Sequence, residues 1–295
     1  MINADLHIHT VYSADGELST GEILNLARSS GMETIAITDH NVTGGISGAL
    51  KDAAGAGIRV IPGIEIDCIY KGTDLHVLGY NIQWKDPAYT RLADEISGLV
   101  RTAFNEMVHN LKILGIEAEA AEIMKTEGDR LPSAEMIAEY LLGNPAYDHH
   151  PKLAPYRAGG ERSDNPYLNF YLDFFAQGKP AYVKISFMDF SNAISLITGT
   201  GGIPVIAHPG HNFRGREEVV IDLLAAGAKG IEVFNNYHNE SQIAYLSDVA
   251  VKRNALITCG SDFHGKNKPA IQMGQFKLND RYEGYLTESI EELLC

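Results

Sequence analysis

Cysteine is rare in this sequence, which has only Cys68, Cys259 and Cys295 among its 295 residues. The three form no CxxC pair, so the chain has neither a disulfide framework nor a thiolate metal motif, and this usage fits a reducing compartment. Cys68 and Cys259 lie on or next to predicted strands. We expect both to be buried structural thiols rather than ligands or nucleophiles.

Long apolar segments are missing as well. No apolar run approaches the roughly 18–20 residues of a membrane-spanning helix. The N-terminal residues, Met-Ile-Asn-Ala-Asp-Leu-His, contain no basic segment followed by an apolar stretch. We therefore expect no membrane partner and a cytoplasmic protein.

Positive charge is in the minority, with 24 lysines and arginines against 38 acidic residues and a formal net charge of −14. A broad surface for nucleic acid or anionic membrane needs clustered Lys and Arg, and a single-strand groove also needs interleaved aromatic residues. We therefore expect no long nucleic acid as a partner. A small anionic substrate would need a local positive centre.

The chain is long enough, and with 45% hydrophobic residues apolar enough, to bury a substantial core. Ser19 and Glu22 form a capping box that predicts a helix start. Apolar segments alternate with helical patterns, which predicts a parallel sheet, and seven strands favour a barrel over an open sheet. Strands are predicted at 3–8, 34–38, 58–66, 74–80, 203–207, 229–234 and 255–260, and helices at 19–31, 45–56, 188–200, 216–227 and 239–253.

One stretch interrupts this alternation, because no convincing strand is predicted between Tyr80 and about Tyr182. We expect a barrel domain from residues 1–85 and 182–295, with a helical insertion at 86–181. An insertion at the catalytic end of a barrel can cover the pocket as a lid or substrate arm, or can add stabilising packing; we favour the lid. Apolar residues follow helical spacing at Leu92, Ile96, Val100, Phe104, Met107, Val108 and Leu111, and again at Met136, Ile137, Tyr140 and Leu141.

Six of the eleven histidines fall at predicted strand ends, and three carboxylates fall there or in the loops that follow. Any one such histidine is more simply explained as a hydrogen-bonded core residue. Packing does not require imidazole repeatedly at this depth, however, and burying so many polar groups without strong partners is costly. The set therefore predicts a multinuclear metal centre. It comprises His7, His9, Asp15, His40, Glu65, His76, His208, Asp262 and His264.

Spacing supports this prediction at both ends of the chain. His7 and His9 are two residues apart, so on a strand both imidazoles point to the same face, and Asp262 and His264 repeat that spacing. Nitrogen and oxygen donors favour two or three Mn²⁺, Fe²⁺ or Zn²⁺ ions without choosing among them. A hydroxide that bridges two such ions forms near neutral pH, and the ions would also make the pocket locally positive.

Taken together, these motifs resemble the PHP family, named after the polymerase and histidinol phosphatase domains. The resemblance implies a distorted (β/α)7 barrel, similar to a TIM barrel, that holds up to three divalent ions. It is carried by Asp5-Leu6-His7-Ile8-His9-Thr10, Ser13-Ala14-Asp15-Gly16, Ile37-Thr38-Asp39-His40, Gly63-Ile64-Glu65, His76 with Gly79, His208-Pro209-Gly210 and Gly260-Ser261-Asp262-Phe263-His264-Gly265.

The resemblance also implies a division of the ligands. His7, His9, Glu65 and Asp262 would hold one ion. Glu65 would bridge to a second ion, shared with His76 and His208. The third ion would be held by Asp15, His40 and His264, so every usual ligand position is filled.

The chain is most similar to a branch of stand-alone phosphoesterases with a helical insertion. That branch includes phosphatases of nucleoside 3′,5′-bisphosphates and hydrolases of small cyclic phosphates. Such bisphosphatases carry basic residues on the arm, whereas the comparable segments 132–136 and 172–175 have none here. We expect metal-dependent hydrolysis of a phosphate ester in a small phosphorylated metabolite, a nucleotide or a sugar phosphate, with a cyclic phosphodiester as the alternative.

Residues outside the ligand set have less defined roles. His211 and Arg214 follow the turn after His208, where they could bind a second anion or protonate the leaving group; a solvated loop is the alternative. Asp39 could orient the imidazole of His40. An exonuclease on short oligonucleotides, a C–N hydrolase and a non-catalytic accessory domain remain alternative functions, and the sequence leaves the oligomeric state open.

Overall fold

We describe the protein from a computed structural model that places residues 3–127 and 131–294. The chain forms two compact units, one made of Met1–Ala93 with Phe187–Cys295 and the other of Asp94–Ser186. The predicted barrel domain includes residues 1, 2 and Cys295, which lie outside the described residues. The covering role of the insertion stays a prediction.

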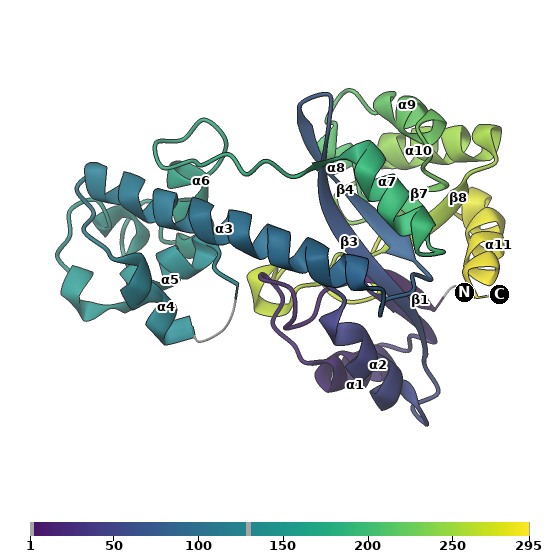
Figure 1. Ribbon diagram of the computed structural model, residues 1–295, viewed down its shortest axis with the longest axis horizontal. Coiled ribbons are helices and arrows are strands. Elements are labelled where there is room, and N and C mark those ends of the chain that lie inside the picture. The colour runs from purple at the N-terminus through teal and green to yellow at the C-terminus, as the bar shows by residue number, and fades with distance from the viewer. Residues whose placement is uncertain (1–2, 128–130, 295) are drawn as a thin grey trace. The chain divides into compact units, whose positions relative to one another are not determined.

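The first unit is built on one mixed sheet (Figure 1). Its main path runs β1-β2-β3-β4-β6-β7-β8, and β5 pairs with β3 off that path. The predicted barrel is confirmed, because Ile8 bridges Phe263 just beyond β8 and so brings the two ends of the path together. The strands are β1 (Ala4–Ile8), β2 (Thr34–Ile37), β3 (Arg59–Tyr70), β4 (Thr73–Tyr80), β5 (Met188–Asp189), β6 (Ile203–Ile206), β7 (Gly230–Asn235) and β8 (Leu256–Gly260).

The expectation of an all-parallel sheet is wrong at β4, which pairs antiparallel with both β3 and β6. β3 and β4 form a long hairpin whose turn is made by Lys71 and Gly72, both with positive φ (48° and 81°). A tight turn reverses the chain directly, whereas a parallel neighbour would need a crossover of a dozen or more residues. The hairpin carries Glu65 and His76 into the sheet interior.

Helices pack against the sheet of this unit. α2 contacts β2 and β3, α7 contacts β3, β4 and β6, α10 contacts β7 and β8, and α11 contacts β8. The predicted capping box is present at α1, where Ser19 accepts from the backbone of Glu22 and Glu22 reaches back. The helices are α1 (Thr20–Ser29), α2 (Gly44–Ala53), α7 (Phe190–Gly199), α8 (Pro209–Asn212), α9 (Val219–Ala225), α10 (Glu240–Arg253) and α11 (Glu283–Leu293), with short 3₁₀ helices η3 (Gly265–Asn267) and η4 (Asp280–Tyr282).

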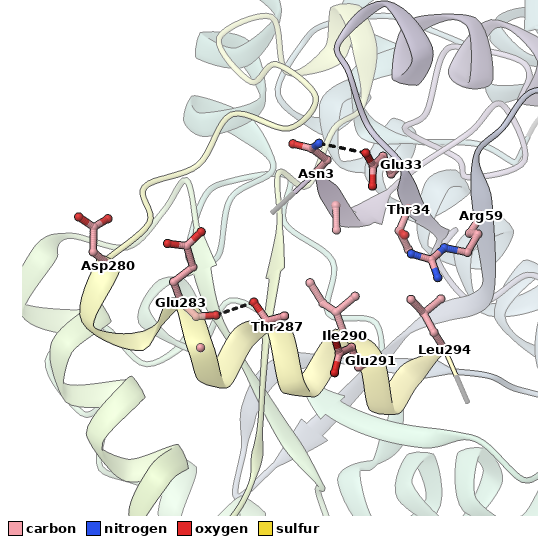
Figure 2. A pocket seen from close by; sticks show the side chains of 12 residues that line it. Asn3, Glu33, Thr34, Arg59, Asp280, Glu283, Thr287, Ile290, Glu291 and Leu294 are labelled. Atoms are coloured by element: carbon pink, nitrogen blue, oxygen red, sulfur yellow. Dashed lines mark hydrogen bonds between the residues drawn. The ribbon is translucent and has the colours of Figure 1, made fainter. Parts of the chain in front are cut away.

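The first residues of β1, β2 and β3 border a cleft of about 910 Å³, which the histidines of the predicted metal centre do not line (Figure 2). Ala4, Thr34 and Arg59 are level in the parallel ladder and line one side of it, and α11 residues such as Thr287 and Ile290 line the other. Because His9 and His40 follow the opposite, carboxyl ends of β1 and β2, this cleft is not part of the predicted metal centre.

The second unit is helical, as predicted, and its described residues form no strand. Its core is made of apolar residues from the predicted stripes, including Phe104, Leu111, Ile137 and Leu141. Its helices are α3 (Pro87–Ile113), which begins in the first unit, α4 (Ala120–Glu127), α5 (Ala134–Gly143) and α6 (Pro166–Phe174), with 3₁₀ helices η1 (Pro145–Tyr147) and η2 (Ala154–Tyr156).

Both described cysteines are buried and free, as expected for structural thiols. Burial raises the pKa of Cys68 and of Cys259 far above the usual thiol value, so neither is a ready thiolate. Within the described part of the chain, every helix is too short or too polar to cross a membrane.

Gly63 shows how closely the hairpin packs. A Cβ at this position of β3 would lie 2.9 Å from the carbonyl oxygen of Ile37 and 3.1 Å from that of Gly79. We expect Gly63→Ala to lower the free energy of unfolding by roughly 1–3 kcal/mol, because backbone on both sides must move. The measurement is urea denaturation followed by circular dichroism.

Gly98→Ala in α3 is the control, because apart from its chain neighbours and its own helix backbone no described atom lies within 4 Å of the added Cβ. Alanine is the better helix former, so this change should stabilise by roughly 0.5–1 kcal/mol. Equal effects of the two substitutions would contradict the steric account of Gly63.

Candidate metal centre

Glu65 stands at the middle of the cluster, on β3, with its side chain fully buried. Its Oε2 lies 3.0 Å from His7 Nε2 and 3.1 Å from His9 Nε2. Its Oε1 lies 2.9 Å from His76 Nδ1 and 3.1 Å from His208 Nε2. The two oxygens of one carboxylate therefore face two different sets of imidazoles.

The structure gathers all nine predicted ligands into three overlapping groups, whose donor atoms lie within 4.8 Å of one another in each group. The first group is His7, His9, Glu65 and Asp262; the second group is Glu65, His76 and His208; the third group is His9, Asp15, His40 and His264. The membership is the one that the family resemblance implies, with His9 added to the third group. The assignment of these residues as metal ligands stays a prediction.

Most of these side chains follow strand ends, as expected. His9 comes directly after β1, and His40, His208, Asp262 and His264 lie in the loops just after β2, β6 and β8. His7 lies inside β1, and Glu65 and His76 lie inside the β3–β4 hairpin, so these three are within strands rather than after them. The long hairpin is what places Glu65 and His76 level with the others.

Two of the candidate ligands have unusual backbone conformations. His208 has φ 24° and Asp262 has φ 59°, both in a region that non-glycine residues rarely adopt. Such conformations cost free energy and persist where the surroundings enforce them, often at functional sites. Here each turns the chain at the end of a strand so that the side chain meets the cluster.

Burial and charge act against each other throughout the cluster. Burial raises the pKa of Glu65, but the imidazoles of His7, His40 and His76 outweigh it and hold that pKa well below its usual range. Burial lowers the pKa of His7, but Glu65, Glu232 and Asp262 outweigh it and hold the pKa well above the usual value. The cluster therefore stabilises charge of both signs without bulk water.

Several donor atoms of the cluster are close together without being hydrogen-bonded, although His76 and His208 do bond to Glu65 Oε1. Among the described residues, the buried Nε2 atoms of His7, His9 and His264 and the Oε2 of Glu65 have no partner in hydrogen-bond geometry. Unpaired buried polar atoms are rare and costly. Imidazole nitrogens and carboxylate oxygens at this spacing fit divalent cations, which would give these atoms their missing partner.

Glu232 is a buried acid on β7 that the sequence interpretation missed. Its Oε1 lies 3.0 Å from His7 Nδ1 and its Oε2 accepts from the backbone N–H of His208 at 2.8 Å. It thus fixes one imidazole and the turn that carries another, as carboxylates behind metal-binding histidines do. The only sequence signal was an acidic residue within an otherwise apolar strand.

His238, in the loop before α10, supports the same turn. Its Nδ1–H donates to the carbonyl of Val233 at 2.8 Å, and its Nε2 accepts from the backbone N–H of Gly210 at 3.0 Å. The buried imidazole therefore joins the end of β7 to the start of α8.

The carboxylate of Asp262 is divided between two environments. Its Oδ1 lies 3.4 Å from His7 Nε2 and 3.2 Å from His9 Nε2. Its Oδ2 accepts from the hydroxyl of Tyr237 and from Lys268 Nζ, each at 2.7 Å. Lys268 and Tyr237 were not among the predicted site residues, yet they leave only Oδ1 free to face the cluster.

The prediction that Asp39 orients His40 is wrong. Asp39 accepts two hydrogen bonds from Thr10, at 2.6 Å from the backbone N–H and 2.8 Å from the hydroxyl. The carboxylate next to His40 is instead Asp67, whose Oδ1 lies 3.0 Å from His40 Nδ1. Asp67 also forms a potential ligand group with His40 and His76.

His211 and Arg214 lie beside the second group. The ring of His211 is 5.8 Å from that of His208 and 4.7 Å from that of Tyr237. Arg214 Nη2 approaches His211 Nδ1 at 3.3 Å, so the imidazole accepts there and carries its proton on Nε2. Partial burial, followed by the charges of His208 and Arg214, lowers the pKa of His211 to about 4, which makes it neutral near pH 7.

We predict that metal binding stabilises the fold more as the pH rises. In the metal-free chain, acidic neighbours outweigh burial and raise the pKa of His7 and of His40 well above 6.5. Their charged forms stabilise this fold below the unfolded pKa of about 6.5, and that stabilisation is lost as the pH rises through the raised values. Metal ions bind the neutral imidazoles. The increase in melting temperature caused by Mn²⁺ should therefore be larger near pH 8 than near pH 6.

His149→Asn is the control, since His149 is exposed and belongs to no ligand group. It should keep the pH dependence of the wild type, whereas His40→Asn should reduce the increase. A Mn²⁺ effect that is equal at both pH values, or greater near pH 6, would contradict the assignment of these imidazoles.

Comparison with known proteins agrees with the geometry. The PHP domain model matches residues 5–157. The chain is 29% identical to the 3′,5′-nucleoside bisphosphate phosphatase of Chromobacterium violaceum, over 93% of this chain and 91% of that protein. It is 30% identical to the 5′-3′ exoribonuclease of Haemophilus influenzae, over 88% of this chain and 89% of that protein. Among solved structures, it is similar to an amidohydrolase from Chromobacterium violaceum with bound SO4 and no metal, at a TM-score of 0.79 and 26% identity, covering 97% and 96% of the two chains.

The matched range contains six of the nine candidate ligands, and His208, Asp262 and His264 lie beyond it. Because the family model spans just over half of the chain and the relatives align over nearly all of it, the resemblance drawn from the motifs is confirmed. The chain belongs to the PHP domain family.

Proposed function

We propose that the chain is a metal-dependent phosphoesterase that hydrolyses a phosphate ester in a small phosphorylated metabolite, a nucleotide or a sugar phosphate. This proposal rests on the contacts of the Glu65 carboxylate. Its Oε2 faces the first group and its Oε1 faces the second. A carboxylate with one oxygen in each of two ligand groups suits adjacent cations of the kind that phosphatases and nucleases use.

In this proposal the three groups hold two or three divalent ions, with Mn²⁺, Fe²⁺ and Zn²⁺ as the candidates. Such ions supply a Lewis acid for phosphoryl oxygens and lower the pKa of bound water from about 15.7 toward 7. Each imidazole would bind its ion while the imidazole ring itself is neutral. Glu232 and His238 keep the turn after β6 in place.

Residues around the groups would receive the anionic substrate. Lys268 is a cation one-third exposed at the edge of the first group, where Asp262 fixes its position. Arg214 is exposed and lies next to His211. His211 is neutral near pH 7, so it would offer the leaving group a hydrogen bond from Nε2–H rather than a positive charge. These cations would attract phosphate within an acidic chain.

Two basic residues of the second unit are already engaged inside it. Arg162 forms a two-point ion pair with Asp173 at 3.0 and 2.9 Å. Arg157 pairs with Asp148 at 3.1 Å and donates to the carbonyls of Leu141 and Leu142. Both arginines therefore serve the packing of this unit, and substrate charge would be met by other residues.

A second candidate function is exonucleolytic cleavage of short oligonucleotides, which the relative named 5′-3′ exoribonuclease favours. A C–N hydrolase is a third, suggested by the solved structure named amidohydrolase. All three use an activated water, so the metal centre does not distinguish them. The three functions differ in the leaving group, which assays on defined substrates identify.

We predict that removal of metal abolishes phosphatase activity and that Mn²⁺ restores it. Asp262→Asn should lower kcat/KM by more than about 100-fold, beyond the usual effect of residues behind a ligand, because Asn is a poor metal ligand. Asp222→Asn, which removes an exposed partner of Lys71, is the matched control and should leave kcat/KM unchanged. Full activity of metal-free protein, or of the Asp262 variant, would overturn the proposal.

Substrate class is tested with Mn²⁺-loaded protein on five kinds of compound. We expect phosphate release from a nucleoside 3′,5′-bisphosphate or a sugar phosphate, or ring opening of a five-membered cyclic phosphate, and no hydrolysis of amides. Stepwise shortening of an RNA oligonucleotide would favour the exonuclease. Amide cleavage without phosphoester cleavage would show the proposed function to be wrong.

A further inference from the structure

His40 and His76 belong to the third and the second of the three main groups, yet both face the same carboxylate, with which they also form a potential ligand group of their own. Asp67 Oδ1 lies 3.0 Å from His40 Nδ1 and 3.3 Å from His76 Nε2. Asp67 is on β3 two residues beyond Glu65, and His76 is its direct cross-strand partner on β4. The β3–β4 hairpin thus brings one acid into contact with an imidazole of the second group and an imidazole of the third.

The opposite nitrogens of these rings face Glu65. His40 Nε2 lies 3.3 Å from Glu65 Oε2 and 3.7 Å from Asp15 Oδ2. His76 Nδ1 lies 2.9 Å from Glu65 Oε1. Each ring therefore has one nitrogen toward Asp67 and the other toward the centre of the cluster, but the two rings use different nitrogens for these contacts.

Asp67 is itself held in one orientation. Its Oδ2 accepts from Asn41 Nδ2 at 2.7 Å, and its backbone N–H donates to Asn41 Oδ1 at 3.0 Å. Asn41 sits at φ 58°, a conformation that asparagine tolerates better than most residues, and its backbone N–H donates to the backbone carbonyl of Glu65 at 2.8 Å. The amide of Asn41 therefore fills one side of the carboxylate and leaves Oδ1 for the imidazoles.

A neutral imidazole has one N–H and one lone pair, and the hydrogen bond made by one nitrogen decides which nitrogen can bind a metal. His40 Nδ1 and Asp67 Oδ1 lie 3.0 Å apart without meeting hydrogen-bond geometry, so the effect of Asp67 is one of charge and proximity. An acceptor-only, negatively charged oxygen beside Nδ1 of His40 favours the proton on that nitrogen and leaves the lone pair of Nε2 for a metal ion. The same oxygen at Nε2 of His76 has the opposite result and leaves Nδ1. Asp67 thereby selects both tautomers at once.

We propose that Asp67 is a positioning residue that fixes His40 as the Nδ1–H tautomer and His76 as the Nε2–H tautomer. The two imidazoles then present Nε2 and Nδ1, respectively, to divalent ions in the third and second groups. One carboxylate thus couples the loading of two ions. This inference rests on the ligand assignment made under the proposed function and adds a residue outside the nine predicted ligands.

Asp67→Asn tests the coupling. An amide cannot accept on both sides, so it must oppose an N–H donor either at Asn41 or at the imidazoles. We expect the affinity for the ions of the second and third groups to fall about 10–100-fold, while the first group keeps its ion. Chelator competition with Zn²⁺, together with the number of ions retained per chain, measures this directly.

Two further variants separate position from charge. Asn41→Gly keeps the charge of Asp67 and allows φ 58°, but it removes the partner of Oδ2, so it should weaken the same two ions to a smaller extent. Asp52→Asn on α2 removes a carboxylate that accepts from Thr20, and it should leave metal affinity unchanged. If Asp67→Asn fails to fold, Asn41→Gly decides the question.

Tautomers are read by ¹⁵N NMR of Zn²⁺-loaded protein with labelled histidine. We expect zinc at Nε2 of His40 and at Nδ1 of His76, and loss of this pattern in Asp67→Asn. Zinc at Nδ1 of His40 or at Nε2 of His76 would show that Asp67 does not hold the proton on that nitrogen, and unchanged affinities in both Asp67→Asn and Asn41→Gly would show that it positions nothing. Either result overturns the inference.

A different result would contradict the proposed function rather than the role of Asp67. If wild-type protein binds no Zn²⁺ or Mn²⁺, or binds them and hydrolyses no phosphoester, the activity assignment is wrong whatever Asp67 does. If wild-type protein binds metal and is active while the Asp67 and Asn41 variants match it, only the role of Asp67 is wrong.

Discussion

The arrangement of the barrel interior depends on the burial of Glu65. An ionised carboxylate without water is very unfavourable unless charged or metal partners surround it. Here imidazoles from β1, β4 and the turn after β6 meet its two oxygens, so widely separated segments must converge for the fold to tolerate it. The β3–β4 hairpin, the turn at His208 and the closure of β1 against the segment after β8 all serve this convergence.

Around this carboxylate, a second layer of side chains restricts the first. Glu232 fixes His7, Tyr237 and Lys268 occupy one oxygen of Asp262, and Asp67 contacts two further imidazoles. Each restriction reduces the number of orientations that a ligand can adopt, which favours metal binding over solvation of free imidazoles. The chemistry of the centre is therefore set by pairs of residues that are distant in sequence.

The sequence predicted the barrel and the nine candidate ligands because short motifs repeat at predicted strand ends. It failed at β4, since alternating apolar segments do not show whether a hairpin or a crossover joins two strands. Asp67, Glu232 and Lys268 were missed because each is a single polar residue without a motif, and its role appears only when another segment lies beside it. The substrate is not encoded in the ligand motifs, because relatives with different named activities share the fold.

The central claim is that Glu65 joins two cation sites. Anomalous diffraction at the zinc edge from Zn²⁺-soaked crystals tests it most directly. We predict at least two peaks, one within about 2.0–2.2 Å of Glu65 Oε2 near His7 and His9, and one at the same distance from Oε1 near His76 and His208. A single peak, or peaks that leave either oxygen without a metal ion, would contradict it.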